Sequence, residues 1–162
     1  MKLYNVTDAY VDYLRQFDSK VPDNKAEKRP FVGIVFSING YNFFAPLSSP
    51  KPKHRGMKNM PDFHKINSGL QGAINFNNMI PIPNSELISI DIDNLTDVNY
   101  KNLLNAQIQF INGIHVSLED KARLLYQLVG SDDEILKPNQ LRVKQRCCNF
   151  GLLQNKSKLY KK

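Results

Sequence analysis

Two hydroxyl side chains and several cations lie close together in the segment 46–55, which reads PLSSPKPKHR. A phosphodiester of RNA carries its own nucleophile, the 2′-hydroxyl. Cleavage needs only that this group is held in line, that its proton is transferred, and that charge on the phosphate is neutralised. Ser48 and Ser49 can hydrogen-bond phosphate oxygens, and Lys51 can stabilise the anion or protonate the leaving 5′-oxygen. The segment therefore holds the side chains for RNA cleavage without an obligatory metal ion.

Proline stiffens the backbone around the two serines. Pro46 and Pro50 each fix a φ angle of about −65°, which limits how far the hydroxyl groups can move. Rigid placement suits a reaction in which position matters more than the reactivity of any one group. The letters Ser-Ser-Pro-Lys are also typical of an ordinary turn, and basic loops are usually solvated. The residues alone leave both interpretations open.

Positive charge is concentrated in two parts of the chain. The 162 residues have a formal net charge of +7, which in a small protein favours a polyanionic partner. Residues 46–83 hold five cations and one anion, net +4, and residues 135–162 hold eight cations and no anion, net +8. Residues 84–134 are acidic, with three cations and nine anions. If the fold brings the two basic segments together, they form one positive face for a nucleic acid.

Other kinds of site have little support in the sequence. The adjacent Cys147 and Cys148 cannot form an ordinary disulfide, so both are expected to be free thiols. The three histidines lie well apart without a carboxylate cluster, so we expect no metal site and no cofactor. No apolar run is long enough for a signal peptide or a membrane span, and free thiols agree with a reducing cytosol.

The strongest structural signal is a hairpin directly before the serines. The runs PFVGIVFSI and YNFFAPL are rich in β-branched and aromatic residues, and they flank the dipeptide Asn39-Gly40. Both runs are apolar at most positions, so the hairpin is expected in the middle of a sheet. Its second strand then delivers Ser48 and Ser49 to its exit.

Three helices are indicated by apolar residues at helical spacing. Residues 8–17 predict a short helix, and residues 100–112 predict a longer one. Another helix is expected to begin at Ser117, because Ser117 and Asp120 resemble a capping box. Its apolar stripe, Leu118, Ala122, Leu125 and Val129, indicates a core face rather than a cofactor site.

Short strands and loops complete the predicted domain. Residues 72–83 and 86–92 read as further strands, whereas 18–28 and 52–71 read as loops. An antiparallel sheet with segregated helices is an α+β arrangement. With 41% hydrophobic residues, the chain is expected to form one domain over residues 1–162.

Six stretches share their order and letters with one known family. They are MKLYNVTDAYVDYLRQFDSKV, RPFVGIV, PLSSPK, AINFNNMIPIP, NAQIQFIN and CNFGLL, and they run from Met1 to about Leu153. Together they resemble the ToxN/AbiQ family of type III toxin-antitoxin endoribonucleases. Several separate motifs agree, which makes the resemblance specific.

The resemblance implies a fold, an activity and a partner. The fold would be similar to the MazF/Kid toxins, a strongly twisted antiparallel sheet with packed helices. The activity would be metal-independent, sequence-preferring cleavage of RNA in the bacterial cytoplasm, leaving a 2′,3′-cyclic phosphate and a 5′-hydroxyl. The partner would be an RNA antitoxin of tandem repeats, each a pseudoknot, which the toxin processes and which joins it in a ring-like assembly. Growth arrest or abortive infection against phage would follow.

The resemblance also assigns catalytic residues position by position. Ser48 and Ser49 match the family's Thr/Ser-Ser pair before a proline, and Lys51 matches the lysine after it. Arg29 replaces a lysine that precedes the first hairpin strand. Its guanidinium stays protonated, so it can clamp a phosphate but cannot be a general acid or base. A tyrosine found in the preceding loop of some members has no counterpart here. The acceptor of the 2′-hydroxyl proton stays open between a neutral Lys51 and a serine relay.

Seven further residues are expected to contact RNA: Lys28, Lys53, His54, Arg55, Lys144, Arg146 and Cys148. The cations lie in or beside the basic segments. His54 is interpreted as an exposed loop histidine that contacts phosphate or acts as an acid, with an idle surface histidine as the alternative. Cys148 lies in the CNFGLL stretch, where the family contacts its RNA, and its alternative interpretation is a small buried residue.

Two other functions remain open at this point. The chain could be an RNA-binding module that uses the same basic face without cutting. It could also be a MazF-like mRNA interferase that is neutralised by a protein antitoxin.

Overall fold

The hairpin predicted from the apolar runs forms the centre of the sheet. In the computed structural model, which describes residues 1–161, strand β2 spans Phe31–Ile38 and strand β3 spans Tyr41–Ser48. Asn39 and Gly40 between them have φ angles of 50° and 80°, the positive values that a tight two-residue turn requires. The predicted hairpin is therefore confirmed.

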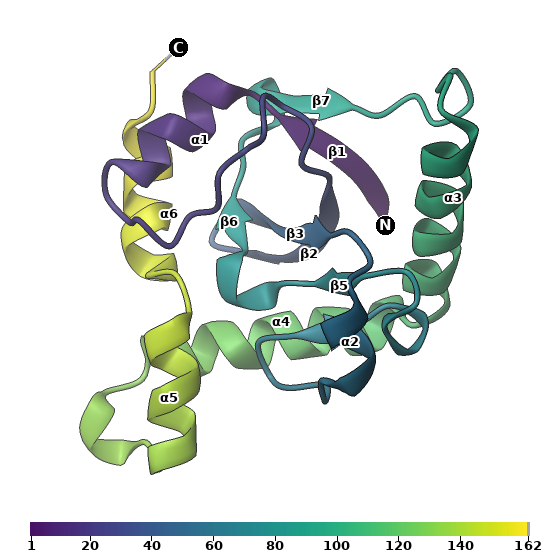
Figure 1. Cartoon of the computed structure of the whole chain (residues 1–162). Helices are drawn as coiled ribbons and strands as arrows, with labels where there is room; N and C mark the ends of the chain where they lie inside the picture. Colours follow the sequence, from purple (N-terminus) through teal and green to yellow (C-terminus); the bar gives the residue numbers. More distant parts are fainter. Residues whose placement is uncertain (162) are drawn as a thin grey trace.

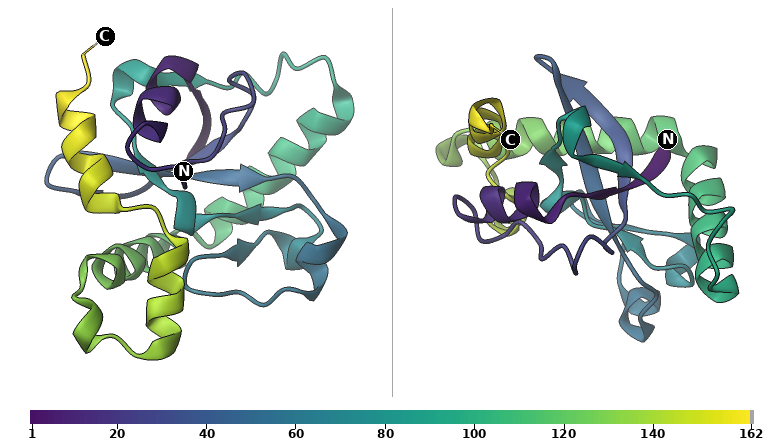
Figure 2. Two further views of the ribbon diagram at one scale, coloured as in Figure 1. Left: turned by 60° about the vertical axis from the view of Figure 1, so that its left-hand side comes forward. Right: turned by 90° about the horizontal axis from the view of Figure 1, so that it is seen from above.

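Shorter strands extend the hairpin on both sides. The strand order is β4-β5-β3-β2-β1-β7, β6 pairs with β3 off this path, and these pairings are antiparallel. The added strands are β1 (Lys2–Val6), β4 (His64–Lys65), β5 (Ala73–Ile74), β6 (Ile80–Pro81) and β7 (Leu87–Ser89). Figure 2 shows β1 and β7 running across the direction of β2 and β3, which agrees with a strongly twisted sheet.

Helices pack around this sheet. They are α1 (Asp8–Arg15), α2 (Pro52–Gly56), α3 (Val98–Gly113), α4 (His115–Gly130), α5 (Pro138–Arg146) and α6 (Phe150–Leu159). Helix α4 packs on β2, and α6 packs on β6, α1 and α4. Helix α3 lies on one side of the sheet, and α1, α5 and α6 lie on the opposite side (Figure 1). The α+β fold is confirmed. Within residues 1–161, no helix has the length and apolar character needed to cross a membrane.

The predicted start of the second long helix is wrong. Helix α4 begins at His115, and Ser117 lies inside its first turn. Only Ile114 separates α3 from α4, and Ile114 provides no side-chain cap, so packing of the two helices rather than a capping box fixes this start. The core stripe was predicted correctly, because Leu118 and Leu125 are buried.

Several elements lie where no clear pattern in the sequence predicts them. Strand β1 pairs between β2 and β7, and α5 and α6 follow each other along one side of the molecule (Figure 2). The segment 52–71, predicted to be irregular, contains α2 and β4. Helix α2 has only five residues and starts with a proline, so its helical pattern is too short to be recognised.

The two cysteines are free, as predicted, and both are buried. Burial raises the pKa of the Cys147 thiol and of the Cys148 thiol to about 12. Both side chains therefore belong to the apolar core at neutral pH.

Candidate active site

The two serines lie where β3 ends and the chain turns towards α2. Ser48 is the last residue of β3 and is half-buried, and Ser49 after it is exposed. The backbone N–H of Leu47 donates a hydrogen bond to the Pro30 carbonyl at 2.8 Å, which ties this end of β3 to the start of β2. Lys51 is exposed and is the N-cap residue of α2. The sheet thus holds the chain up to the serines.

A glycine supports the serines from behind. Gly72 has a φ angle of +92°, and a Cβ atom built on it would overlap the carbonyl oxygen of Ser48 and lie 3.2 Å from the carbonyl carbon of Ser49. Only a glycine fits at this place. From α3, the buried Gln107 donates through Nε2 to the Gln71 carbonyl at 2.7 Å. Helix α3 therefore holds the turn that lies against the serine backbone.

Arg29 is fixed beside this segment. Its Nε donates to the carbonyl oxygen of Asp23 at 2.6 Å. Burial lowers the pKa of the Arg29 guanidinium, and the Asp23 carboxylate partly opposes this shift. The group stays a cation at any working pH. Arg29 and Ser48 both line each of the two pockets described next.

The first pocket, called the polar pocket here, has a volume of about 570 Å³. Besides Arg29 and Ser48, it is lined by the polar side chains of Lys51, Lys53, His54, Asp62, Asn75, Asn77, Asn78 and Arg146, and by the apolar side chains of Met57, Met60 and Phe63. Cations and amide groups are the partners that phosphate oxygens prefer. This pocket is suited to a ribose-phosphate backbone.

The second pocket, called the apolar pocket, has a volume of about 440 Å³. Ser48, Ser49 and Arg29 form one border. Its walls are mostly aliphatic and aromatic: Leu47, Ile90, Leu95, Tyr100, Leu103 and Leu104. Asn5, Gln107, Lys25 and Lys28 also line it. The serines therefore lie between two pockets of different chemistry.

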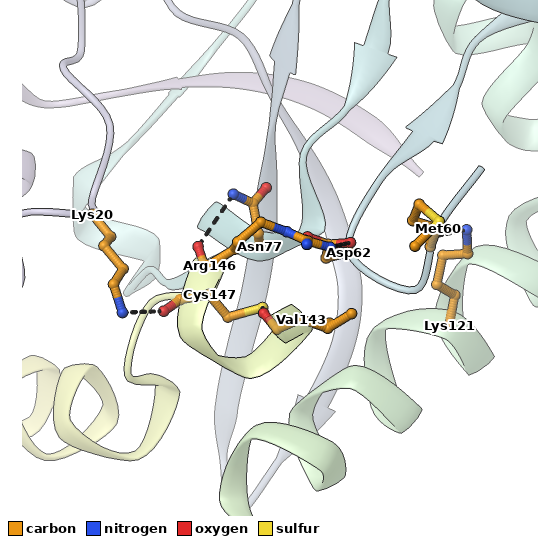
Figure 3. A network of polar contacts seen from close by, with 8 residues as sticks. All are labelled: Lys20, Met60, Asp62, Asn77, Lys121, Val143, Arg146 and Cys147. Carbon is orange, nitrogen blue, oxygen red and sulfur yellow. Dashed lines mark hydrogen bonds and ion pairs between the residues drawn. The ribbon is translucent and has the colours of Figure 1, made fainter. Parts of the chain in front are cut away.

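An ion pair closes one side of the polar pocket. Arg146, at the end of α5, donates through Nε and an Nη to the two carboxylate oxygens of Asp62, at 2.9 and 3.0 Å (Figure 3). The Asp62 side chain is 6% exposed and that of Arg146 is 49% exposed. The Asn77 amide donates to the Arg146 carbonyl at 3.5 Å in the same network. Asp62 raises the pKa of Arg146, chiefly through this hydrogen bonding. One edge of Arg146 is therefore engaged with protein, and the rest faces solvent.

A comparison with known families agrees with this geometry. The family model for the toxin ToxN of type III toxin-antitoxin systems matches residues 2–158. The chain belongs to this ToxN family. It is 34% identical to Endoribonuclease ToxN of Pectobacterium atrosepticum, over 96% of this chain and 91% of the relative. It is 33% identical to Endoribonuclease AbiQ of Lactococcus lactis subsp. lactis, over 100% and 90%. This ToxN-family chain is an endoribonuclease.

Solved structures of the ToxN family share the whole fold. One structure, from a study of selective toxin inhibition by a non-coding RNA pseudoknot, has a TM-score of 0.87 at 35% identity, covering 98% of this chain and 96% of the other. A structure of AbiQ, described as a lactococcal anti-phage endoribonuclease of a type III system, has a TM-score of 0.79 at 28% identity, with the same coverage. The resemblance seen in the six sequence stretches is confirmed.

Two of the residues predicted to contact RNA are buried in this ToxN-family chain. His54 lies on α2 with 2% exposure, and its ring packs 5.9 Å from the Phe63 ring, so the expectation of an exposed loop histidine is wrong. Burial lowers its pKa, and Lys51 and Lys53 lower it further. Cys148 is fully buried and its backbone N–H donates to the Asn77 carbonyl at 2.8 Å. Its thiol cannot reach RNA, and the alternative of a small buried residue is correct.

The predicted cations fall into different surroundings. Lys53 lines the polar pocket, Lys28 lines the apolar pocket, and Arg55 is exposed on α2. Lys144 lies away from both pockets, where its ammonium pairs with Asp133 at 2.7 Å and donates to the Ser131 carbonyl at 2.6 Å. These contacts give Lys144 a structural role in the last turn of α5.

Other residues of the polar pocket were not predicted from the sequence. The polar pocket includes Asn75, Asn77 and Asn78, which lie at a 3₁₀ turn in the AINFNNMIPIP stretch. Three asparagines within four positions were a usable signal for a polar surface. Asp62 and Gln107 had no such signal, because their partners are 84 and 36 residues away in the chain.

Proposed function

We propose that this endoribonuclease cuts RNA at the segment Ser48–Lys51, by attack of the 2′-oxygen on the neighbouring phosphorus. The bond from phosphorus to the 5′-oxygen breaks, and the products are a 2′,3′-cyclic phosphate and a 5′-hydroxyl. One proton leaves the 2′-hydroxyl and one is delivered to the 5′-oxygen, so this step consumes no water. The observation that carries the proposal is the position of the two serines: Ser48, together with Arg29, lines both pockets, and the exposed Ser49 beside it lines the apolar pocket.

Each of four residues has a separate role in this proposal. Ser49 is exposed and donates a hydrogen bond to a phosphate oxygen, and the half-buried Ser48 orients the same group. Lys51 lies over the polar pocket and either neutralises the phosphorane or protonates the 5′-oxygen. Arg29 clamps the phosphate from the border that both pockets share. A fixed constellation of this kind loses little entropy when the reaction occurs.

The proposed partner is an RNA antitoxin that binds over the same site. A polyanion complements the +4 charge of residues 46–83, and the Arg146 edge left free by Asp62 adds to that surface. A similar solved toxin is described with selective inhibition by a non-coding RNA pseudoknot. We extend this to tandem pseudoknot repeats that the toxin itself cuts, closing with it into a ring-like assembly. A tandem array of short repeats in the DNA just upstream would support this partner, and a small open reading frame alone there would contradict it.

The setting of the proposed activity follows from its substrate. RNA transcripts and an RNA inhibitor are available together in the bacterial cytoplasm, where we place the toxin. A similar chain, AbiQ, is described as an anti-phage endoribonuclease. Release of this toxin would then arrest growth or abort phage infection. The sheet and helices share one core, which supports a single catalytic domain over residues 1–162.

The variant Ser49→Ala tests the catalytic proposal. Removing one preset hydrogen-bond donor to the developing anion is expected to lower kcat by about 10²-fold to 10³-fold while RNA affinity is largely retained. Cleavage of a labelled RNA in EDTA, with the product ends identified, measures the first quantity, and a binding titration measures the second. Ser89→Ala, at an exposed position of β7, is the matched control and should cut normally. Unchanged cleavage by Ser49→Ala, or wild-type cleavage only with magnesium, would overturn the proposal.

A further inference from the structure

The apolar pocket has a lining that the binding of a phosphate does not require. It adjoins the polar pocket at Arg29 and Ser48, and its walls are largely hydrocarbon and aromatic, with Lys25, Lys28 and Arg29 as its cations. Leu95, Leu103 and Leu104 line it together with the ring of Tyr100. Such walls are suited to the faces of a flat, apolar ring rather than to a charged backbone.

Two buried acceptors in this pocket have no partner. Across residues 1–161, Asn5 Oδ1 and Gln107 Oε1 accept no hydrogen bond and are shielded from solvent. Both residues line the apolar pocket. Buried acceptors without partners are rare in native proteins, and each one calls for an explanation. A ligand with N–H donors supplies one explanation.

The Gln107 amide is oriented by the fold. Its Nε2 donates to the Gln71 carbonyl, which can only accept, so the oxygen must be the atom that is left free. Gln107 is 2% exposed, so bulk solvent does not reach this oxygen. Asn5 reaches the pocket from β1, on a different element. Two amide oxygens from separate elements thus lie at one small apolar pocket.

We propose that the apolar pocket binds the base of a nucleotide flanking the cleaved phosphate, and that Asn5 and Gln107 accept hydrogen bonds from an exocyclic amino group on that base. This assignment rests on the proposed cleavage at the serines, which places a phosphate at the border of the pocket. Adenine, cytosine and guanine carry such an amino group. Uracil does not, because its N3–H lies between two carbonyl oxygens that would face the two acceptors. The pocket therefore selects amino-bearing bases against uracil.

The cations at the mouth of the apolar pocket agree with an RNA strand that inserts one base there. Lys25 and Lys28 line it and are exposed, so their ammonium groups can meet the next phosphate once the base is inserted. The polar pocket takes the backbone on the other side of the cleaved bond. One strand can thus cross the serines with a base bound on one side and phosphates bound on both.

Short RNA strands with one cleavable bond test the assignment. All other positions carry 2′-deoxyribose, and each of the two nucleotides that flank the bond is varied in turn through adenine, cytosine, guanine and uracil. At one position, the wild-type enzyme should prefer at least one amino-bearing base over uracil by about tenfold in kcat/KM, the size of one or two hydrogen bonds. If adenine is preferred there, purine ribonucleoside, which lacks the 6-amino group, should lose the same factor.

Variants of the two amides give the decisive comparison. Asn5→Ala and Gln107→Met remove the acceptors, so the preference ratio at that position should fall towards one. Asn5→Asp keeps an acceptor and should keep the ratio. Asn84→Ala, at an exposed asparagine away from both pockets, is the control and should keep the wild-type ratio. A variant that folds poorly cleaves all the strands more slowly by the same factor, so the base-preference ratio does not change. Thermal melting measures the stability of each variant separately.

Binding to fully deoxy-substituted strands separates this assignment from the proposed function. If the Kd values show the same base preference but no strand with a cleavable bond is cut, the pocket assignment is supported and catalysis at the serines is overturned. Cleavage with no base preference at either position, or with a preference that Asn5→Ala and Gln107→Met leave intact, would overturn the pocket assignment and leave catalysis standing.

Discussion

The polar pocket and the apolar pocket share Arg29 and Ser48, yet one is lined by cations and amides and the other mostly by hydrocarbon. A ribonuclease that cuts next to chosen bases needs both environments. Charges and hydrogen-bond donors stabilise the phosphorane. In an apolar pocket that excludes water, the few hydrogen bonds that distinguish one base from another contribute more free energy. Because Ser48 lines both pockets and Ser49 lines the apolar pocket, the two adjacent serines can serve both surfaces.

The two pockets also differ in how the chain builds them. Most of the polar pocket comes from residues 48–78, with Arg146 added from α5. The apolar pocket joins Asn5 of β1, the segment 90–95 and α3. The residues proposed as catalytic are therefore gathered mainly by local turns, and the proposed base site is gathered by the packing of distant elements. The following predictions separate these two parts, from the largest expected effect to the smallest.

Gly72→Ala should displace the backbone of the two serines at the edge of the pockets. The added Cβ overlaps the Ser48 carbonyl, so the serine backbone must move, and a shift of about 1 Å can cost about 10²-fold in rate. We expect kcat to fall more than about 10²-fold on all strands, whatever their bases. Gly40→Ala is the matched control, because Gly40 also has a positive φ, +80°, but its Cβ would meet nothing within 4 Å. That control should lose about 1 kcal/mol of stability and keep its activity. Normal cleavage by Gly72→Ala would contradict the supporting role.

Lys51→Arg should affect the polar pocket alone. Arginine keeps the positive charge but does not release its proton at working pH. If Lys51 delivers the proton to the 5′-oxygen, kcat should fall by about 10-fold to 10²-fold, and the base preference of the apolar pocket should be unchanged. A pH-rate profile of the variant measures this. Full activity would show that Lys51 acts through its charge only.

Asp62→Asn should weaken the wall of the polar pocket. The variant leaves Arg146 without its carboxylate partner at a site where Asp62 is 6% exposed, so the free energy of unfolding should fall by about 2 kcal/mol. Chemical denaturation measures this loss. Asp133→Asn, which removes the partner of Lys144 and is 71% exposed, should cost less than about 1 kcal/mol. Equal losses in the two variants would show that the Asp62 pair is an ordinary surface pair.

Arg146→Ala has a different signature from Asp62→Asn. If the free edge of Arg146 contacts phosphate, the variant should reduce the salt dependence of RNA binding by about one phosphate contact. Asp62→Asn leaves the cation in place and should keep that slope. An unchanged slope in Arg146→Ala would restrict this residue to a structural role.

His64 should make the stability of the folded protein fall at acid pH. Burial and then the Lys121 ammonium lower the pKa of His64 to about 4, and Lys121 donates towards its Nδ1 at 3.2 Å. The unfolded ring titrates at about 6.5, so between these values the unfolded state binds more protons. Stability should therefore fall as the pH drops from about 6.5 to about 4. At this half-buried site the effect is about 1 kcal/mol, measured as the difference between wild type and His64→Asn at pH 7 and pH 4.5. Parallel stability curves for the two proteins would contradict it.

The hairpin, and the closeness of the residues proposed as catalytic, could be predicted from the sequence because their signals are local. Asn39-Gly40 between two apolar runs leaves few alternatives to a tight turn, and the strand that follows must end at Ser48. The pair of serines, the neighbouring prolines and Lys51 are adjacent in the chain, so their proximity needs no tertiary information. The order of six motifs also identified the family before any coordinates were considered.

Only the tertiary structure decided which of the other polar residues are free to act. His54 follows two lysines in the sequence, yet α2 turns its ring inward against Phe63. Arg146 and Lys144 look alike in a basic segment, but Asp62 holds one beside the polar pocket and Asp133 holds the other away from it. The reason is physical. A short-range pattern fixes periodicity and turns, whereas burial and pairing depend on contacts between residues far apart in the chain, and one sequence carries no direct record of those contacts.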